Sequence, residues 1–189
     1  MASTPVNTEN TIARTANLLG ALALEATGAL SAATATVVGR SGAAAAALVV
    51  VAARPGCSIE YLREPLGLSQ PGAVRLVEHL VGQGWIERGG PGGRRGLQLR
   101  LTPEGREVFE RLVAARRGAL IALLEPLPED DRERLAELLE RLLAGQVDGW
   151  SDLERLCRLC ERRVCAQCPV SRAFQAIPDA EQPWPPERR

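Results

Sequence analysis

The sequence predicts a mainly α-helical fold with one small β-hairpin. Three features predict it: long proline-free segments with apolar residues at helical spacing, two short helices joined by a glycine-containing turn, and a glycine-rich loop between two alternating segments. The chain has 189 residues, of which 46% are hydrophobic and 24% are charged. This is an ordinary globular composition, and the length suits one folded unit with an appendix.

Two helices are expected before residue 54. Residues 10–38 contain no proline, and their leucines mark a helix with a broad apolar side. The stretch AAAAALVVVAA, residues 43–53, has no polar side chain, so we expect a core helix that is buried on all sides. It is too short to span a bilayer, and the opening residues lack the pattern of a secretory signal. We therefore expect a cytoplasmic protein with no membrane partner.

The next segment predicts a helix-turn-helix. Ser58 is suited to cap a short helix, IEYLREPLG, which Pro65 and Gly67 close. Ser69 is suited to cap a second helix with apolar residues at helical spacing, and Gly84 marks its end. Two short helices separated by a turn with glycine are typical of this motif.

A two-stranded wing is expected after these helices. Residues 85–87 and 97–101 alternate between apolar and polar side chains, as strands with one buried face do. The loop between them, RGGPGGRRG, has five glycines and one proline in nine positions, which favours a hairpin turn over any regular structure.

Two long helices and a short one complete the prediction. Thr102 can cap a helix over residues 104–124, and Asp130 lies at the start of another. The second of these helices has leucines at i, i+3, i+4, i+7 and i+8, namely Leu135, Leu138, Leu139, Leu142 and Leu143. A short helix over 151–157 follows, and the proline-rich residues beyond Phe174 are expected to be extended and mobile.

The segment LGLSQPGAVRLVEHLVGQGWIERGGPGGRRGLQLRLTPEGRE, residues 66–107, resembles the winged helix-turn-helix of the MarR family. The motifs LSQPxxxRLVxxL, GWIER and RRxxxxxLTPEG occur together and in the family's order. The resemblance implies a homodimer that binds double-stranded DNA at a pseudo-palindromic operator and regulates transcription. It also implies that residues 10–38 and 105–146 interlock between protomers. An intramolecular core is the alternative use of these apolar faces.

The residues themselves also favour DNA as a partner. Residues 69–106 carry six arginines against three glutamates, although the whole chain has no formal net charge. A helix that begins at Ser69 directs backbone N–H groups and a positive dipole end toward a phosphate, while glutamine and arginine can bind base edges. The expected DNA-binding residues are Ser69, Gln70, Gly72, Arg75, Arg88, Arg94, Arg95 and Arg100.

The wing departs from the family pattern at one position. Arg94 and Arg95 lie at the tip of the hairpin, where an arginine can enter a narrow minor groove. Members of the family usually carry an aspartate just before this pair, and this chain has Gly93 instead. Arg88 or Arg100 is therefore expected to share the role. His79, four residues after Arg75, receives no function, because a lone histidine on a helix is usually a surface or core residue.

Four of the five cysteines form a separate motif near the end of the chain. Cys157-x-x-Cys160 and Cys165-x-x-Cys168 have the spacing with which two thiolates bind one ion. Four thiolates can hold a zinc ion in a tetrahedron, although the two pairs are unusually close to each other. An iron–sulfur cluster is the alternative, since a cysteine followed by proline, as at Cys168, recurs at cluster sites. A thiol switch and an inert segment remain open as further possibilities.

The expected domains are an N-terminal dimerisation helix, the winged helix-turn-helix, two dimerisation helices, a cysteine-rich module and a proline-rich tail. Their ranges are 1–40, 41–104, 105–149, 150–175 and 176–189.

Three classes of function compete at this point. The first is a transcriptional regulator whose DNA affinity depends on the metal or redox state of the cysteines, or on a small aromatic ligand near Tyr61, Trp85 and Phe109. The second is an iron–sulfur electron carrier. The third is an adaptor that binds protein, which the exposed arginines oppose. A single histidine and the lack of a phosphate-binding loop before a helix argue against an enzyme.

Overall fold

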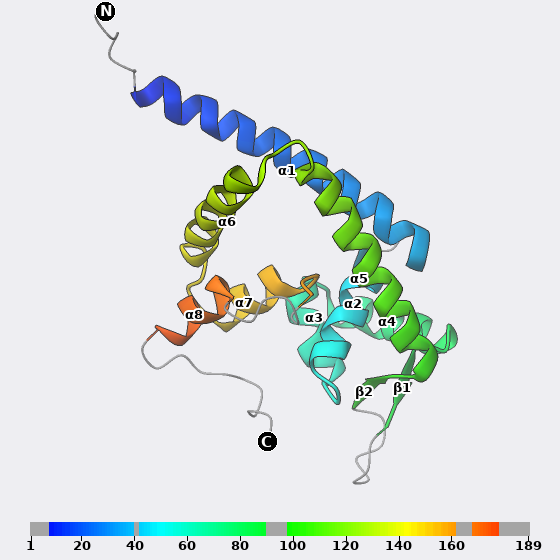
Figure 1. Ribbon diagram of the computed structural model, residues 1–189. Coiled ribbons are helices and arrows are strands. Elements are labelled where there is room, and N and C mark those ends of the chain that lie inside the picture. Colours follow the sequence, from blue (N-terminus) through cyan, green and yellow to red (C-terminus); the bar gives the residue numbers. More distant parts are fainter. Residues whose placement is uncertain (1–7, 40–41, 90–97, 162–167, 178–189) are drawn as a thin grey trace, which may run out of the picture.

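The computed structural model describes residues 8–39, 42–89, 98–161 and 168–177. Within these ranges the protein is mainly helical with one antiparallel two-stranded sheet, which confirms the predicted fold class (Figure 1). The elements in chain order are α1 (Thr8–Val38), α2 (Gly42–Ala53), α3 (Ile59–Leu66), α4 (Gln70–Gly82), β1 (Ile86–Arg88), β2 (Leu99–Leu101), α5 (Pro103–Leu124), α6 (Glu129–Ala144), α7 (Trp150–Cys157) and α8 (Pro169–Gln175).

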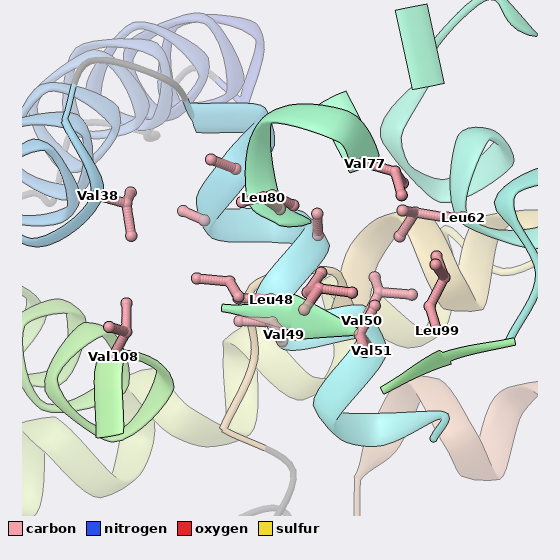
Figure 2. Close-up of a cluster of buried hydrophobic side chains, with 14 of the residues drawn as sticks. Val38, Leu48, Val49, Val50, Val51, Leu62, Val77, Leu80, Leu99 and Val108 are labelled. Atoms are coloured by element: carbon pink, nitrogen blue, oxygen red, sulfur yellow. The ribbon is translucent and has the colours of Figure 1, made fainter. Parts of the chain in front are cut away.

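Helix α2 forms the centre of the main core. Every residue from Ala44 to Val51 is buried, which confirms the prediction of a helix covered on all sides. Apolar side chains reach it from α1, α3, α4, β2 and α5, and those of Val38, Leu62, Val77, Leu99 and Val108 are drawn around it in Figure 2. The helix-turn-helix and the wing are therefore fixed to one shared core.

The helix-turn-helix has the predicted caps. The Ser58 hydroxyl accepts a hydrogen bond from the Tyr61 N–H at 3.0 Å, and Gly67 ends α3 with a left-handed conformation at φ 64°. Pro65 lies inside α3, which continues to Leu66. A proline this near the C-terminus of a short helix removes only one intrahelical donor, and Gly67 sets the end.

The wing is tied to both neighbouring helices. Strands β1 and β2 pair in the register Ile86 with Leu101, Glu87 with Arg100, and Arg88 with Leu99. The Thr102 hydroxyl donates to the Gly84 carbonyl at 2.6 Å, and the Thr102 N–H donates to the Trp85 carbonyl at 3.1 Å. The end of β2 is thus anchored to the turn between α4 and β1.

Helices α1 and α6 leave most of their large apolar residues exposed. Helix α1 packs along α5, and α6 runs from the far end of α5 toward α8 (Figure 1). Helix α6 buries none of its residues, and its leucines at 138 and 142 are each 53% exposed. In α1 the exposed apolar residues are Ile12, Leu18, Leu19, Leu22 and Leu24. A single protomer therefore does not bury these surfaces.

Residues Asn10–Val38 of α1 are also long and apolar enough to cross a membrane, and only 11% of the 18-residue window that meets this criterion is buried. Core helices and signal sequences share these two properties, so length and composition by themselves assign no membrane to α1.

The C-terminal residues fold into a second, smaller unit. Helices α7 and α8 pack together over an apolar cluster that contains Val147, Leu153, Cys157, Val170 and Phe174. The short helix leading to Cys157 was predicted, whereas α8 was not. Pro169 occupies the first turn of α8, where its missing N–H is tolerated. Helix α7 packs against α3, and α8 packs against α6.

Candidate functional site

Helix α4 presents one exposed face beside the wing. Its buried residues are Ala73, Val77 and Leu80, spaced i, i+4 and i+7, so they fix α4 to the core along one side. Gln70 and Arg75 lie on the exposed side, as expected for residues that reach a groove.

The start of α4 offers fewer free amides than the sequence argument assumed. Pro71 has no N–H, and the Gly72 N–H donates to the hydroxyl of the exposed Ser69 at 3.3 Å. The Ala73 N–H donates to the Ser69 carbonyl at 2.9 Å. These bonds leave at most the Gln70 amide of the first turn for a phosphate. Gly72 takes part in the cap as the donor to Ser69, and a Cβ at Gly72 would lie 3.2 Å from the Ser69 hydroxyl.

His79 shares the exposed face with Arg75, one helical turn away. The sequence argument gave this histidine no role. Its spacing of four residues from Arg75 is the signal that could have placed it on the same surface.

The two described arginines of the wing differ in position. Arg88 is exposed at the end of β1, whereas Arg100 is half-buried in β2. The guanidinium of Arg100 lies beside Gly56 in the turn before α3, where a Cβ would be 3.5 Å from its Nη2 atom. Arg88 is therefore available to a ligand, and Arg100 partly serves the packing of the wing. Arg94, Arg95 and Gly93, which the sequence places at the tip, lie outside the described residues.

The aromatic residues proposed to line a ligand pocket lie around the main core. Tyr61, Trp85 and Phe109 each pack at the edge of the main core. An open hollow lies instead at the start of α5, where it is lined by Leu101, Pro103, Arg106, Glu107 and Glu110. Its lining has no aromatic side chain.

Three of the four clustered cysteines lie in the C-terminal unit. Cys157 is buried, and Cys160 and Cys168 are half-buried against the same apolar cluster. The Cys160 N–H donates to the Cys157 carbonyl at 3.0 Å, which forms a turn after α7. Cys165 lies outside the described residues, and the described parts of the chain contain no group of three close metal-ligating side chains.

Cys57 belongs to the main core. It is fully buried and pairs through its backbone with Leu99 of β2. Burial raises the pKa of its thiol from 9.0 to about 12, so it stays protonated in the folded protein at neutral pH.

A charged contact joins the cysteine-rich unit to the helix-turn-helix. Glu154 of α7 has a side chain that is 2% exposed, and its Oε1 lies 3.5 Å from Nη2 of Arg54, the residue after α2. The Arg54 guanidinium also lies 5.5 Å from the ring centroid of Trp150. Burial raises the pKa of the Tyr61 hydroxyl in α3, and the nearby Glu154 carboxylate raises it further. Tyr61 is thus within the field of this contact.

A second charged contact lies beyond the first cysteine pair. Glu161 is buried, and its Oε2 lies 3.2 Å from Nη1 of Arg117 in α5. Leu159, between the two contacts, packs against the main core. The segment 154–161 is therefore fixed at three points, to Arg54, to the main core and to α5.

The sequence profile of the MarR family matches residues 38–96. This segment of the chain is therefore similar to the MarR family. The transcriptional repressor MprA of Escherichia coli strain K12 is 31% identical over 80 residues, which are 42% of this chain and 46% of the repressor. The aligned part thus spans about half the length of that relative.

Solved structures share the fold of the winged helix-turn-helix and of its flanking helices. The YusO protein of Bacillus subtilis has a TM-score of 0.62 at 18% identity, over 71% of this chain and 95% of its own. The MarR family protein Rv2887 of Mycobacterium tuberculosis, solved in complex with DNA, has a TM-score of 0.58 at 21% identity, over 74% and 98%. The same protein was also solved with p-aminosalicylic acid, with a TM-score of 0.55 at 23% identity, over 67% and 96%.

Proposed function

We propose that this protein is a DNA-binding transcriptional regulator that acts inside the cell as a homodimer. The observation that best supports this proposal is the exposed face of α4. Ser69 caps this helix, and the hydrogen bond of Thr102 to Gly84 holds the antiparallel wing beside it. The solved complex of Rv2887 with DNA supports this assignment, since that protein shares the fold. Gln70, Arg75 and Arg88 are the described residues that contact the duplex, with Arg94 and Arg95 contributing from the wing.

A second copy of the chain is the proposed partner of α1 and α6. Both helices expose rows of apolar side chains, and α6 buries none of its residues in the described protomer. Apolar surface of this extent on long helices is typical of an interface. We call α4 together with strands β1 and β2 the reading head. Two copies of the chain joined through α1 and α6 carry two reading heads, one for each half-site of a pseudo-palindromic operator.

The direct experiment is titration of a labelled duplex from the region upstream of the protein's own coding sequence, followed by fluorescence anisotropy at several salt concentrations. Affinity is expected to fall linearly with salt on logarithmic axes, because each phosphate contact releases counterions. Arg75→Ala and the pair Arg94→Ala with Arg95→Ala should each weaken binding at least fivefold. Arg134→Ala on α6, whose exposed guanidinium pairs with the exposed Asp131, is the matched control. Equal affinity of all variants would refute the assignment of the reading head.

The C-terminal cysteines form the proposed input of the regulator. Their number and spacing in the sequence suit a zinc ion or an iron–sulfur cluster, although Cys157, Cys160 and Cys168 do not form a metal-binding group among the described residues. Zinc would stabilise the fold of the unit, whereas a cluster would add a redox response. Metal analysis with an anaerobic visible spectrum separates the two, because zinc is colourless and a cluster absorbs visible light.

A small aromatic acid is the second candidate input. The complex of Rv2887 with p-aminosalicylic acid supports it. If variants with Cys157 and Cys160 replaced by serine retain full regulation and salicylate shifts the titration, the ligand is the input and the cysteines have only a structural role.

A further inference from the structure

One face of α7 carries both the first cysteine and the main contact with the winged domain. Trp150, Leu153, Glu154 and Cys157 are spaced i, i+3, i+4 and i+7, so they lie along one stripe of a two-turn helix. The last three are buried. A short helix moves as a unit, and a displacement at Cys157 therefore displaces Glu154, which is one turn away.

A buried glutamate lies on each side of the first cysteine pair in the sequence. Glu154 precedes Cys157 by three residues, and Glu161 follows Cys160 directly. Each carboxylate faces an arginine outside the unit: Glu154 faces Arg54 at the end of α2, and Glu161 faces Arg117 of α5. A buried carboxylate that loses its cation is strongly destabilised, so the two contacts form or break as a whole and do not slide.

Helix α3 connects the contact between Glu154 and Arg54 to helix α4. Arg54 closes α2 beside the turn that leads to α3, and Tyr61 of α3 lies in the field of Glu154. Leu62, next to Tyr61, is fully buried in the core cluster that also holds Val77 of α4. The position of α3 thus sets the support of α4, which carries Gln70 and Arg75.

We infer that the contact of Glu154 with Arg54 and Trp150 couples the cysteine-rich unit to the DNA-reading helix. With the unit docked, the contact holds α3 and α4 in the arrangement that binds DNA. A change at Cys157 that does not fit its buried site moves α7 as a body, separates Glu154 from Arg54 and releases α3. This inference rests on the proposed function, since it names the route by which the cysteines affect DNA affinity.

The test uses the full-length protein and alkylation of the cysteines with N-ethylmaleimide, after EDTA and reductant have removed any metal or disulfide. Cys57 is spared, because its raised pKa and full burial keep it unreactive, and mass spectrometry checks this. Alkylation of the wild type is expected to weaken operator binding at least fivefold. It should also speed amide hydrogen exchange in α3 more than in α1.

Glu154→Gln is the decisive variant, because it keeps the size of the side chain and removes its charge. We expect its operator binding to be weakened before alkylation, and alkylation to change it by less than twofold. Glu140→Gln is the matched control, since the pair of Glu140 with Arg172 joins α6 to α8 on the exposed side of the same unit. That variant should respond to alkylation as the wild type does. If Glu154→Gln fails to fold, Arg54→Met breaks the same contact from the partly exposed partner.

The outcomes separate this inference from the proposed function. A wild type that binds no operator fragment in any state refutes the proposed function, while hydrogen exchange in α3 still tests the contact. A wild type that binds DNA and does not respond to alkylation overturns the inference. An equal response of Glu154→Gln and wild type overturns it as well.

Discussion

We expect Gly105→Ala to destabilise the protein. The substitution favours the helix through its propensity, but it also creates a steric clash with Trp85, and the clash is the larger effect. Gly105 lies in the first turn of α5 and is buried against the wing. In the interior of a helix, Gly→Ala usually stabilises by about 1 kcal/mol. A Cβ at Gly105, however, would lie 1.8 Å from the Trp85 carbonyl oxygen and 2.7 Å from its carbon. Cβ contacts below 3.0 Å essentially never occur, so the backbone of α5 or β1 must shift by more than 1 Å.

Such a shift would break a specific contact. The Trp85 carbonyl accepts the Thr102 N–H at 3.1 Å, next to the pairing of Ile86 with Leu101. Losing one hydrogen bond costs about 1 kcal/mol, and forcing extra volume into a packed site costs about 1–3 kcal/mol. The net loss after the gain in helix propensity is therefore about 2 kcal/mol. For a chain of this size it corresponds to a fall in Tm of roughly 4–8 °C.

The assay is thermal unfolding by circular dichroism at one fixed protein concentration, since association also changes Tm. Gly118→Ala in the same helix is the control, because a Cβ there meets no atom within 4 Å. It should raise Tm by roughly 2–4 °C through helix propensity alone. A Gly105→Ala protein as stable as Gly118→Ala would show that the contact between α5 and Trp85 is not as close as described.

Three further perturbations have simpler expectations. Ser58→Ala removes the hydroxyl that accepts the Tyr61 N–H at 3.0 Å and should lower the free energy of unfolding by about 1 kcal/mol in urea titrations. Leu142→Arg introduces a charge on the exposed apolar stripe of α6 and should halve the molar mass in light scattering; an unchanged mass would exclude this stripe from the dimer interface. The pKa of Cys57 is raised from 9.0 to about 12, so the unfolded chain releases this proton first as pH rises. Stability is therefore lost between about pH 9 and 12, and Cys57→Ala should reduce the slope in this window by about 1.4 kcal/mol per pH unit, measured by urea unfolding.

Local chemistry made much of the fold predictable. Ser58, Ser69 and Thr102 each cap a helix as their sequence context predicts, because a cap depends on only a few neighbouring residues. The burial of α2 followed from the absence of polar side chains in it. The number of free amides at the start of α4 was overestimated, because the bonds made by the capping residue itself were not counted.

The contacts between the two units could not be predicted from the sequence. Arg54 and Glu154 are 100 residues apart, and no local pattern pairs one arginine with one glutamate at that separation. Glu154 did give a partial signal, since it falls on the apolar stripe of a short amphipathic helix. A charged residue there needs a buried partner. Gly105 likewise reads as an ordinary helical glycine until the position of Trp85 is known.

The cysteine-rich unit contacts the proposed dimer helices as well as the reading head. Helix α8 packs against α6, and Arg172 pairs with Glu140 at 3.4 Å, while α7 on the other side of the unit packs against α3. In a dimer built through α1 and α6, the distance between two reading heads must match half-sites separated by about 34–36 Å. In such a dimer, the cysteine-rich unit would affect this distance through its contact with α6 and through its contact with α3. Rearrangement at Cys157 would then change the spacing of the two heads as well as the support of each, and the loss of operator affinity would exceed the loss of affinity for a single half-site.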